Sequence, residues 1–498
     1  MIQINQPLFI HTCSSAIIIV PGISYFWKML KSLVILLIII TAICSCERMP
    51  SPDRMKLVFS EDTINFDTVF TSIGSATREL RIKNAERSKI NIDHIYISGG
   101  QTSQFRLNID GESVSEKRNM ELDRGDSLFI FIDVLVDPTN RNSPIAITDS
   151  IMFIMGDETQ KVQLLAWGQN INLINKKLIL SETWDSLKPY VIFSNVMVDT
   201  SETLTVEEGA RIYFHRNSSM TIAGNLVVNG SVRSPVLFAG DRLEKMYEDI
   251  PGQWSGLFFL NTSKGNNIDH AIIRNTIYGL RLGETGTGAE MPDMKLFSSS
   301  ISHSTISGLS AINGIIEAAD CIFYHCGSYC ISLSAGGNYT FTQCSVFNQW
   351  EYGFRLTASL YISEKPVTSG GTTSQMDLNF NNSVVFGNIL SEVDIIPLAT
   401  SPSGNYYFDH CLLKLDTINA SFWDRDEFPG TLINKNPLFI DESVWDLRPD
   451  TLSPLIENGN PVYITGYPVD FRGVLRPVDG NPDIGAYERI PGEHKKEK

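Results

Sequence analysis

Apolar and polar residues alternate along several short stretches in the first third of the chain. RELRIKN (78–84), SLFIFIDVLV (127–136) and KVQLLAW (161–167) each place apolar residues at every second position. A period of two is typical of half-buried β-strands. Turn signals such as SGG, DRGD and DPTN separate these stretches. About seven strands fit between residues 56 and 171, which predicts a β-sandwich.

The pattern changes further along, where a repeat of 22–23 residues begins. CIFYHCGSYCISL (from Cys321) aligns without a gap with CSVFNQWEYGFRL (from Cys344), and SSISHSTISGLSA (from Ser299) fits one period earlier. AIIRNTIYGLRL, from Ala271, fits with one residue deleted. Three short strands in such a period make one coil of a parallel β-helix, in which each coil buries its apolar residues against its neighbours.

The last strand of each aligned coil predicts which side chains point outward. The tetrads GLRL, GLSA, CISL and GFRL begin at residues 279, 308, 330 and 353. Their second and fourth residues are apolar and are expected to face the core. The third residues are Arg281, Ser310, Ser332 and Arg355, which are expected to face solvent.

Three cysteines and a histidine within CIFYHCGSYC raise the question of a zinc site, because thiolate and imidazole are the usual ligands of zinc. The repeat offers another explanation. Asn275, His303, His325 and Asn348 occupy one column at a turn, and Asn and His are enriched in left-handed backbone. Cys321 and the cysteine one coil later share a column with small residues, and a free cysteine behaves as a small hydrophobe. We therefore favour a structural role and expect no metal.

The N-terminal region resembles a bacterial lipoprotein signal. Lys28 and Lys31 precede an apolar run, 33–40, and ICSC follows with Cys46 in the position of the lipidated residue. The alternative is a membrane anchor, but the run is shorter than the roughly 20 residues that a span needs. This signal begins near Met29, so residues 1–28 are interpreted as a mis-assigned start or a removed extension. Cleavage and lipidation of Cys46 leave five other cysteines, an odd number that cannot form a fully paired disulfide framework.

Two stretches resemble known families. DTVFTSIGSATRELRIKN and INIDHIYISGG are similar to immunoglobulin-like domains of bacterial envelope proteins. The coils, together with LTVEEGARIYFHRNSSMTIAGNLVVNGSV before them and DFRGVLRPVDGNPDIGAYE at the C-terminus, resemble right-handed parallel β-helix proteins of the pectate-lyase-like superfamily, in a branch found among surface lipoproteins of Bacteroidetes. The resemblance implies an all-β chain, but it leaves the activity open because members include lyases, hydrolases and adhesins.

These observations divide the chain into segments. They are 1–28, an extension; 29–45, a signal peptide; 46–55, a tether; 56–171, an immunoglobulin-like β-sandwich; 172–490, a right-handed parallel β-helix with a closing motif; and 491–498, a charged tail.

The charge restricts the partners. A net charge of −16 argues against nucleic acid. It is compatible with Ca²⁺, although the sequence shows no cluster of carboxylate ligands, and no other cofactor is expected. The chain also lacks HExxH, GxSxG and phosphate-loop motifs. The charged insert GDRLEKMYEDIPG (240–252) is interpreted as a solvated loop.

Two hypotheses for function follow. The first is a membrane-anchored envelope protein, expected at the outer membrane, that binds glycan or another surface component along the β-helix flank. The second is a polysaccharide lyase or glycosidase. For the first, the candidate ligand-binding residues are Arg281, Arg355, Tyr329 and Tyr352, because arginine can bond carboxylates bidentately and aromatic rings can stack on sugars. An acidic polysaccharide is the expected ligand.

Overall fold

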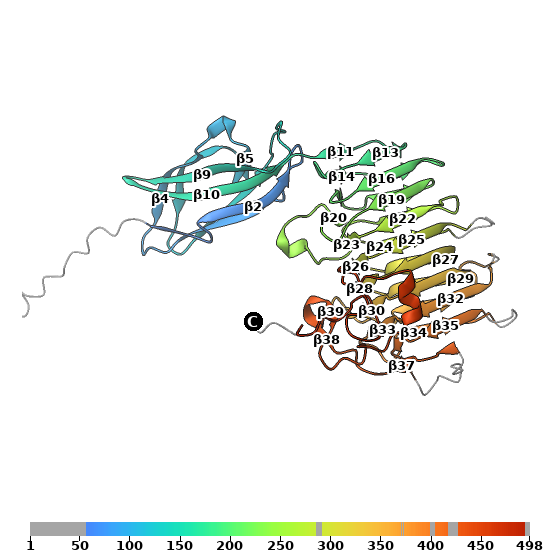
Figure 1. Ribbon diagram of the computed structural model, residues 1–498. Coiled ribbons are helices and arrows are strands. Elements are labelled where there is room, and N and C mark those ends of the chain that lie inside the picture. The colour runs from blue at the N-terminus through green and yellow to red at the C-terminus, as the bar shows by residue number, and fades with distance from the viewer. Residues whose placement is uncertain are drawn as a thin grey trace, which may run out of the picture.

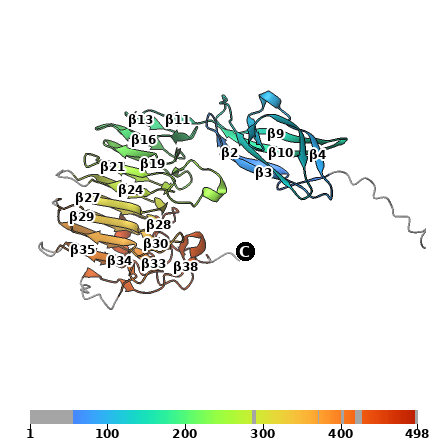
Figure 2. The same cartoon turned by 180° about the vertical axis from the view of Figure 1, so that it is seen from behind.

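The computed structural model describes residues 56–284, 291–369, 371, 373–398, 404–416 and 427–493. It contains an N-terminal β-sandwich followed by a long stack of parallel strands, and this arrangement confirms the predicted all-β fold (Figure 1). The sandwich lies beside the N-terminal end of the stack in both views (Figures 1 and 2).

The sandwich has two five-stranded sheets, three strands more than predicted. The extra strands include β1 and β6, which are only three and two residues long. The first sheet has the order β1-β3-β8-β5-β6 and the second β2-β10-β9-β4-β7, with all neighbours antiparallel except β2 and β10. Their bounds are β1 Leu57–Phe59, β2 Thr63–Phe70, β3 Arg78–Asn84, β4 Ile90–Ile97, β5 Phe105–Ile109, β6 Glu112–Ser113, β7 Glu116–Leu122, β8 Ser127–Val134, β9 Ile145–Met155 and β10 Glu158–Gln169.

The alternating residues form the core of the sandwich as predicted. Leu80, Ile82, Ile130 and Ile132 are fully buried between the sheets, and the residues between them face outward. Burying one such side chain contributes about 1.5–3 kcal/mol, so the alternation alone orients each sheet.

The second domain is a parallel β-helix with three strands per coil. Face 1 comprises β11 Asn172–Ile174, β14 Tyr190–Ile192, β17 Arg211–Phe214, β20 Val236–Gly240, β23 Ala271–Arg274, β26 Ser300–Ser304, β28 Ile322–Cys326, β30 Ser345–Asn348, β33 Val384–Gly387, β36 Leu412–Leu413 and β37 Leu432–Ile433. Face 2 comprises β12 Leu178–Ile179, β15 Val196–Val198, β18 Ser219–Ile222, β21 Gly256–Phe259, β24 Tyr278–Leu282, the first parts of β27 Ser307–Ala319 and β29 Tyr329–Thr342, β31 Leu360–Ser363 and β34 Val393–Ile396. Face 3 comprises β13 Glu182–Trp184, β16 Thr203–Glu207, β19 Asn225–Asn229, β22 Asn266–Asp269, β25 Asp293–Phe297, the second parts of β27 and β29, β32 Met376–Asn381 and β35 Asn405–Asp409.

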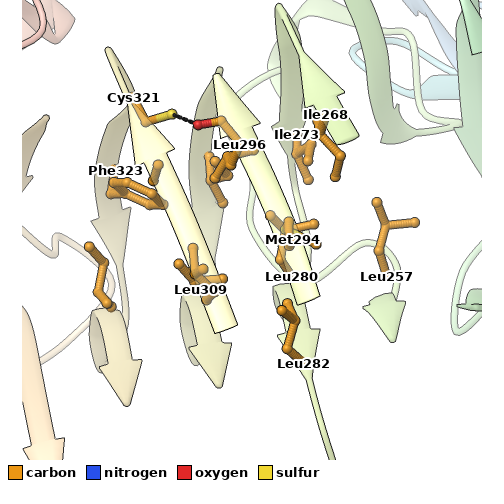
Figure 3. Packing of buried hydrophobic residues seen from close by; sticks show 14 of the residues in the cluster. Leu257, Ile268, Ile273, Leu280, Leu282, Met294, Leu296, Leu309, Cys321 and Phe323 are labelled. Carbon is orange, nitrogen blue, oxygen red and sulfur yellow. Dashed lines mark hydrogen bonds between the residues drawn. The ribbon is translucent and has the colours of Figure 1, made fainter. Parts of the chain in front are cut away.

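Equivalent residues of successive coils stack inside the β-helix. Leu257, Leu280, Leu309 and Ile331 are in register along face 2, and all four are fully buried. Figure 3 shows the first three. The thiol of Cys321 donates to the carbonyl of Leu296, 3.2 Å away, within the same core.

The turn residues largely follow the prediction. Asn275, His303 and His325 have φ of 66°, 52° and 53°, so three members of the column adopt the left-handed backbone, whereas Asn348 is not among the residues with positive φ. Burial raises the pKa of the Cys321 thiol well above its usual value, which keeps it protonated.

The prediction of a strand at residues 353–356 is wrong, and so is the prediction that Arg355 faces solvent. β31 at Leu360–Ser363, not GFRL, pairs with β29, with Leu360 beside Ile331. The segment before β31 forms a loop in which Phe354 is 99% exposed and Leu356 is 89% exposed. Both stretches alternate apolar and polar residues, but only LYIS is in register with the preceding coil.

The C-terminal residues cover the outer side of face 1, near β28 to β36 (Figure 1). This cover begins with β38 Phe439–Asp441 and β39 Asp446–Pro449 and ends in the closing motif. Outward apolar residues of face 1 such as Ile322, Phe347 and Val384 are buried beneath it. Within the motif, the buried guanidinium of Arg476 donates to Asp320 of the β-helix. The motif therefore fastens the cover to the coils.

Candidate functional site

The outer surface of face 2 carries the in-register column that contains Arg281. The column passes from Thr221 through Phe258 to Arg281, and then through Ser310, Ser332 and Tyr361. A neighbouring column places Tyr278, Ser307 and Tyr329 side by side. We refer to the partly exposed members as the face 2 strip: Thr221, Phe258, Tyr278, Arg281, Ser310, Tyr329, Ser332 and Tyr361.

A hollow of about 340 Å³ lies at Arg281. Its lining includes Thr221, Phe258 and Glu284. The Arg281 guanidinium lies 5.7 Å from the ring centroid of Tyr278, which is itself 6.4 Å from the Phe258 ring. Among the residues that the structure describes, no ion pair involves Arg281. The guanidinium thus lies beside one ring, with a second ring in the same hollow, and keeps donors for a ligand.

A glycine makes this arrangement of strands feasible. Gly256 begins β21 with φ of 128°, and an added Cβ there would lie 1.7 Å from the carbonyl oxygen of Tyr278. Only glycine allows the chain to enter face 2 this closely. The close approach brings the Phe258 strand directly beside the Tyr278 strand.

Tyr329, a second predicted site residue, also lies on face 2. Its ring is 5.0 Å from that of Tyr361, one coil further on. Burial raises the pKa of the Tyr329 phenol, so its hydroxyl remains a donor at neutral pH. Tyr329 and Arg281 lie on strands two coils apart, about 10 Å at the usual strand spacing.

Arg355 does not belong to this strip, although the sequence placed it there. Its side chain is 1% exposed and pairs with Glu392, whose side chain is 0% exposed. Two bonds join them, Nη2 to Oε1 at 2.6 Å and Nη1 to Oε2 at 2.8 Å. Arg355 therefore fastens its own loop to the next coil and is not available to a ligand.

Tyr352 lies at a different place, the corner between faces 1 and 2. Its side chain is 54% exposed, and its ring is 5.7 Å from His325 and 5.3 Å from Trp350. Trp445 of the cover also stacks on His325, with ring centroids 4.8 Å apart. The structure thus separates Tyr352 from Arg281 and Tyr329 and packs it against a histidine.

The two buried histidines of this corner are uncharged. Burial lowers the pKa of His303 to about 3 and that of His325 to about 4. Neither ring nitrogen of His325 has a hydrogen-bond partner within the described part of the chain. The His303 Nε2 lies 3.6 Å from an oxygen of Asp249, too long for a hydrogen bond, and with the imidazole neutral this is a contact and not an ion pair.

Other polar groups have structural partners. Asp320 is bound to Arg476, and Asp269 to its neighbour His270 at 2.6 Å. Within the ranges that the structure describes, no group of three or more His, Cys, Asp or Glu side chains could hold a metal ion.

The predicted lipidation residue, Cys46, lies outside the described residues, as does the signal peptide. In the described ranges, no helix is long and apolar enough to cross a membrane.

Sequence reasoning missed Phe258, Tyr278 and Tyr361. Each stands at an outward position of a strand whose inward residues were recognisable, for example Leu360 and Ile362 around Tyr361. Aligning the inward residues of successive coils would have shown that these three aromatic residues lie at outward positions of neighbouring strands.

No protein-family model matches the chain, and no curated protein matches it. Solved structures match about a quarter of it. The ASH/PapD-like domain of human CEP192 is 14% identical over 25% of this chain and 91% of that one, with a TM-score of 0.17. A family 123 glycoside hydrolase from Clostridium perfringens is 8% identical over 22% of this chain and 25% of that one (0.18). A protein of unknown function from Porphyromonas gingivalis W83 is 13% identical over 26% and 57% (0.18). These values carry no argument about function.

Proposed function

We propose that the protein is a lipid-anchored component of the cell envelope that binds an acidic polysaccharide along the face 2 strip. The observation that carries the proposal is Arg281, an arginine without an ion-pair partner among the described residues, which lies beside the Tyr278 ring in a hollow that Phe258 also lines. The lipoprotein signal before Cys46 and the resemblance to surface lipoproteins of Bacteroidetes support the location, which we place at the outer membrane.

The chemistry of the strip suits alternating charged and apolar parts of a polymer. A guanidinium bonds a carboxylate or sulfate through two parallel N–H donors. Phe258, Tyr278, Tyr329 and Tyr361 offer ring faces for the C–H faces of sugars. Ser310 and Ser332 lie between the two aromatic groups and offer hydroxyls. The strip thus provides apolar contacts at both ends and polar contacts between them.

The net charge of −16 makes the arginine decisive, because an acidic polymer is otherwise repelled. We expect binding to weaken with added salt, since charges separated by more than a Debye length of about 8 Å are screened at physiological ionic strength.

The test is a calorimetric titration of the full chain in detergent. Polygalacturonate, alginate and chondroitin sulfate are titrated separately, and the heat of binding gives each affinity. We expect Arg281→Ala to weaken binding about tenfold, which corresponds to one lost charge-assisted bond pair. Arg281→Lys should recover only part of this affinity, because lysine lacks the planar fork.

The control is Arg106→Ala, which removes the same charge from the exposed face of the sandwich. It should bind like wild type. If Arg281→Ala also binds like wild type, or if the wild type binds none of the three polymers, the strip is not the binding site. Unsaturated products released during the titration would instead indicate the lyase hypothesis.

A further inference from the structure

A second hollow, of about 330 Å³, lies where the sandwich meets the β-helix. We call it the junction hollow. Thr68 of β2 lines it from the sandwich, Tyr213 of β17 and Arg274 of β23 from face 1, and Arg242, Lys245 and Glu248 from the charged insert. In Figures 1 and 2 this insert projects from the β-helix toward the sandwich. Both domains therefore build the hollow.

The insert is held in one conformation by two side-chain amides, those of the buried Asn275 and the half-buried Gln253. The Asn275 Nδ2 donates to the carbonyl oxygens of Glu248 and Ile250, at 2.8 and 3.0 Å. The Gln253 Nε2 donates to the carbonyl oxygens of Tyr247 and Ile250, at 2.7 and 2.9 Å. The insert is thus a fixed part of the hollow and not a freely solvated loop.

The cationic groups are also oriented. Glu244 accepts from Nε and Nη2 of Arg242, at 3.1 and 2.9 Å, and the guanidinium lies 3.8 Å from the Tyr247 ring centroid. Arg274 contacts Glu248 through Nη1 at 3.2 Å, while its Nε is buried without a hydrogen-bond partner in the described part of the chain. Lys245 is exposed and takes part in no ion pair among the described residues.

The lining is positive although the chain is strongly negative. Arg242, Lys245 and Arg274 contribute three positive charges. Glu248 of the lining and Glu244, which pairs with Arg242, contribute two negative charges, so one positive charge is left. Burial raises the pKa of the Tyr213 phenol, so its hydroxyl is protonated and can donate. Two guanidiniums, an ammonium and a phenol thus offer donors around the hollow, and such a lining matches an oxyanion.

We propose that the junction hollow binds a phosphate or sulfate group, either as the free ion or as an ester on a sugar. Arg274 and Lys245 make the direct contacts, and Arg242 is held beside them by Glu244. A ligand in this position contacts both domains, so it also fixes the sandwich against the β-helix. The site is separate from the face 2 strip and does not depend on the function proposed for it.

The test uses calorimetry on the full chain with inorganic phosphate, inorganic sulfate, glucose 6-phosphate and glucose 6-sulfate at constant ionic strength, with acetate as the monovalent comparison. We expect the wild type to bind a phosphate or sulfate probe at least about tenfold more tightly than acetate, because its additional oxygens and charge can engage the Arg274 guanidinium as well as the Lys245 ammonium. Affinity for the esters that equals or exceeds affinity for the free ions identifies an ester as the ligand. Preference for the free ions identifies the ion itself.

Lys245→Met removes a partnerless charge from an exposed side chain, so the variant should fold and bind the oxyanion about tenfold more weakly. Lys264→Met, at an exposed position between β21 and β22 that does not line the hollow, is the matched control and should retain wild-type affinity. Arg281→Ala should also retain it, which separates this site from the strip. Equal binding of acetate, no binding of the phosphate and sulfate probes, or unchanged affinity in Lys245→Met would each overturn the proposal.

Discussion

The buried pair of Arg355 and Glu392 should stabilise the protein strongly. Both side chains are almost fully buried, so solvent screens their interaction little. Glu392 also accepts from the backbone N–H and the hydroxyl of Ser359 and from the N–H of Ile389. Through these bonds the pair joins the loop before β31 to the loop before β34. Loss of the arginine leaves a carboxylate that is buried and unpaired.

We expect Arg355→Met to lower the free energy of unfolding by about 3–5 kcal/mol, the usual cost of removing one partner from a buried pair. Methionine keeps most of the apolar volume, so the effect reports the charge. In the double variant Arg355→Met, Glu392→Gln, no charge is left unpaired and the amide oxygen still accepts. This variant should recover part of the loss.

Urea titration followed by tryptophan fluorescence measures these free energies. The control is Lys295→Met, which breaks an exposed pair with Glu317 (61% and 43% exposed) and should change stability by about 0.5 kcal/mol or less. A loss under about 1 kcal/mol for Arg355→Met would contradict the reasoning. So would a double variant that is less stable than Arg355→Met alone.

Two further predictions concern the N-terminus and the turn histidines. Cys46→Ala should leave the protein unprocessed or release it from the membrane fraction, which fractionation and mass spectrometry of the N-terminus would detect; normal acylation of this variant would exclude Cys46 as the lipidated residue. His325→Asn should fold normally, because asparagine tolerates the φ of 53° at this turn, and wild type and variant should both lack stoichiometric zinc. The folded-state pKa of His325 is about 4, below 6.5 in the unfolded chain, so stability present above pH 6.5 is lost as pH falls toward 4, by about 3 kcal/mol for this residue. His325→Asn should show that much less acid destabilisation in urea titrations between these pH values, and an unchanged pH dependence would show that His325 is not a buried neutral group.

The sequence predicted the coils well because register in a β-helix is a local property. Leu309 and Ile331 stack because each follows its turn histidine by six residues, and Leu280 stays in register with Leu309 although its turn is one residue shorter. The same rule failed at Arg355, where a loop precedes the strand and carries an equivalent alternation of its own. Hydrophobic period alone does not distinguish a core-facing leucine from Leu356 at the tip of a loop. The partner of Arg355, Glu392, comes 37 residues later and has no counterpart in the repeat.

The sequence contains a signal for the cover over face 1. The assumption that every second residue of a strand faces solvent hid this signal. Strands such as IFYHC at β28 and VVFG at β33 are apolar at both alternating positions. Such strands are typical of sheets buried on both sides. The inner residues belong to the main core, and the outer ones, including Ile322 and Val384, form a second core with the C-terminal segment.

The same coverage bears on where a polymer can bind. The insert and the sandwich approach face 1 near β17 to β23, and the C-terminal cover occupies it near β28 to β36. On face 3, Tyr467 of the cover reaches Glu317 with a hydrogen bond of 2.7 Å. Face 2 keeps a continuous in-register surface from Thr221 to Tyr361, with the partially exposed rings and Arg281 on it. A long ligand that follows the coils therefore meets the fewest obstructions on the flank where arginine and aromatic side chains already occur together.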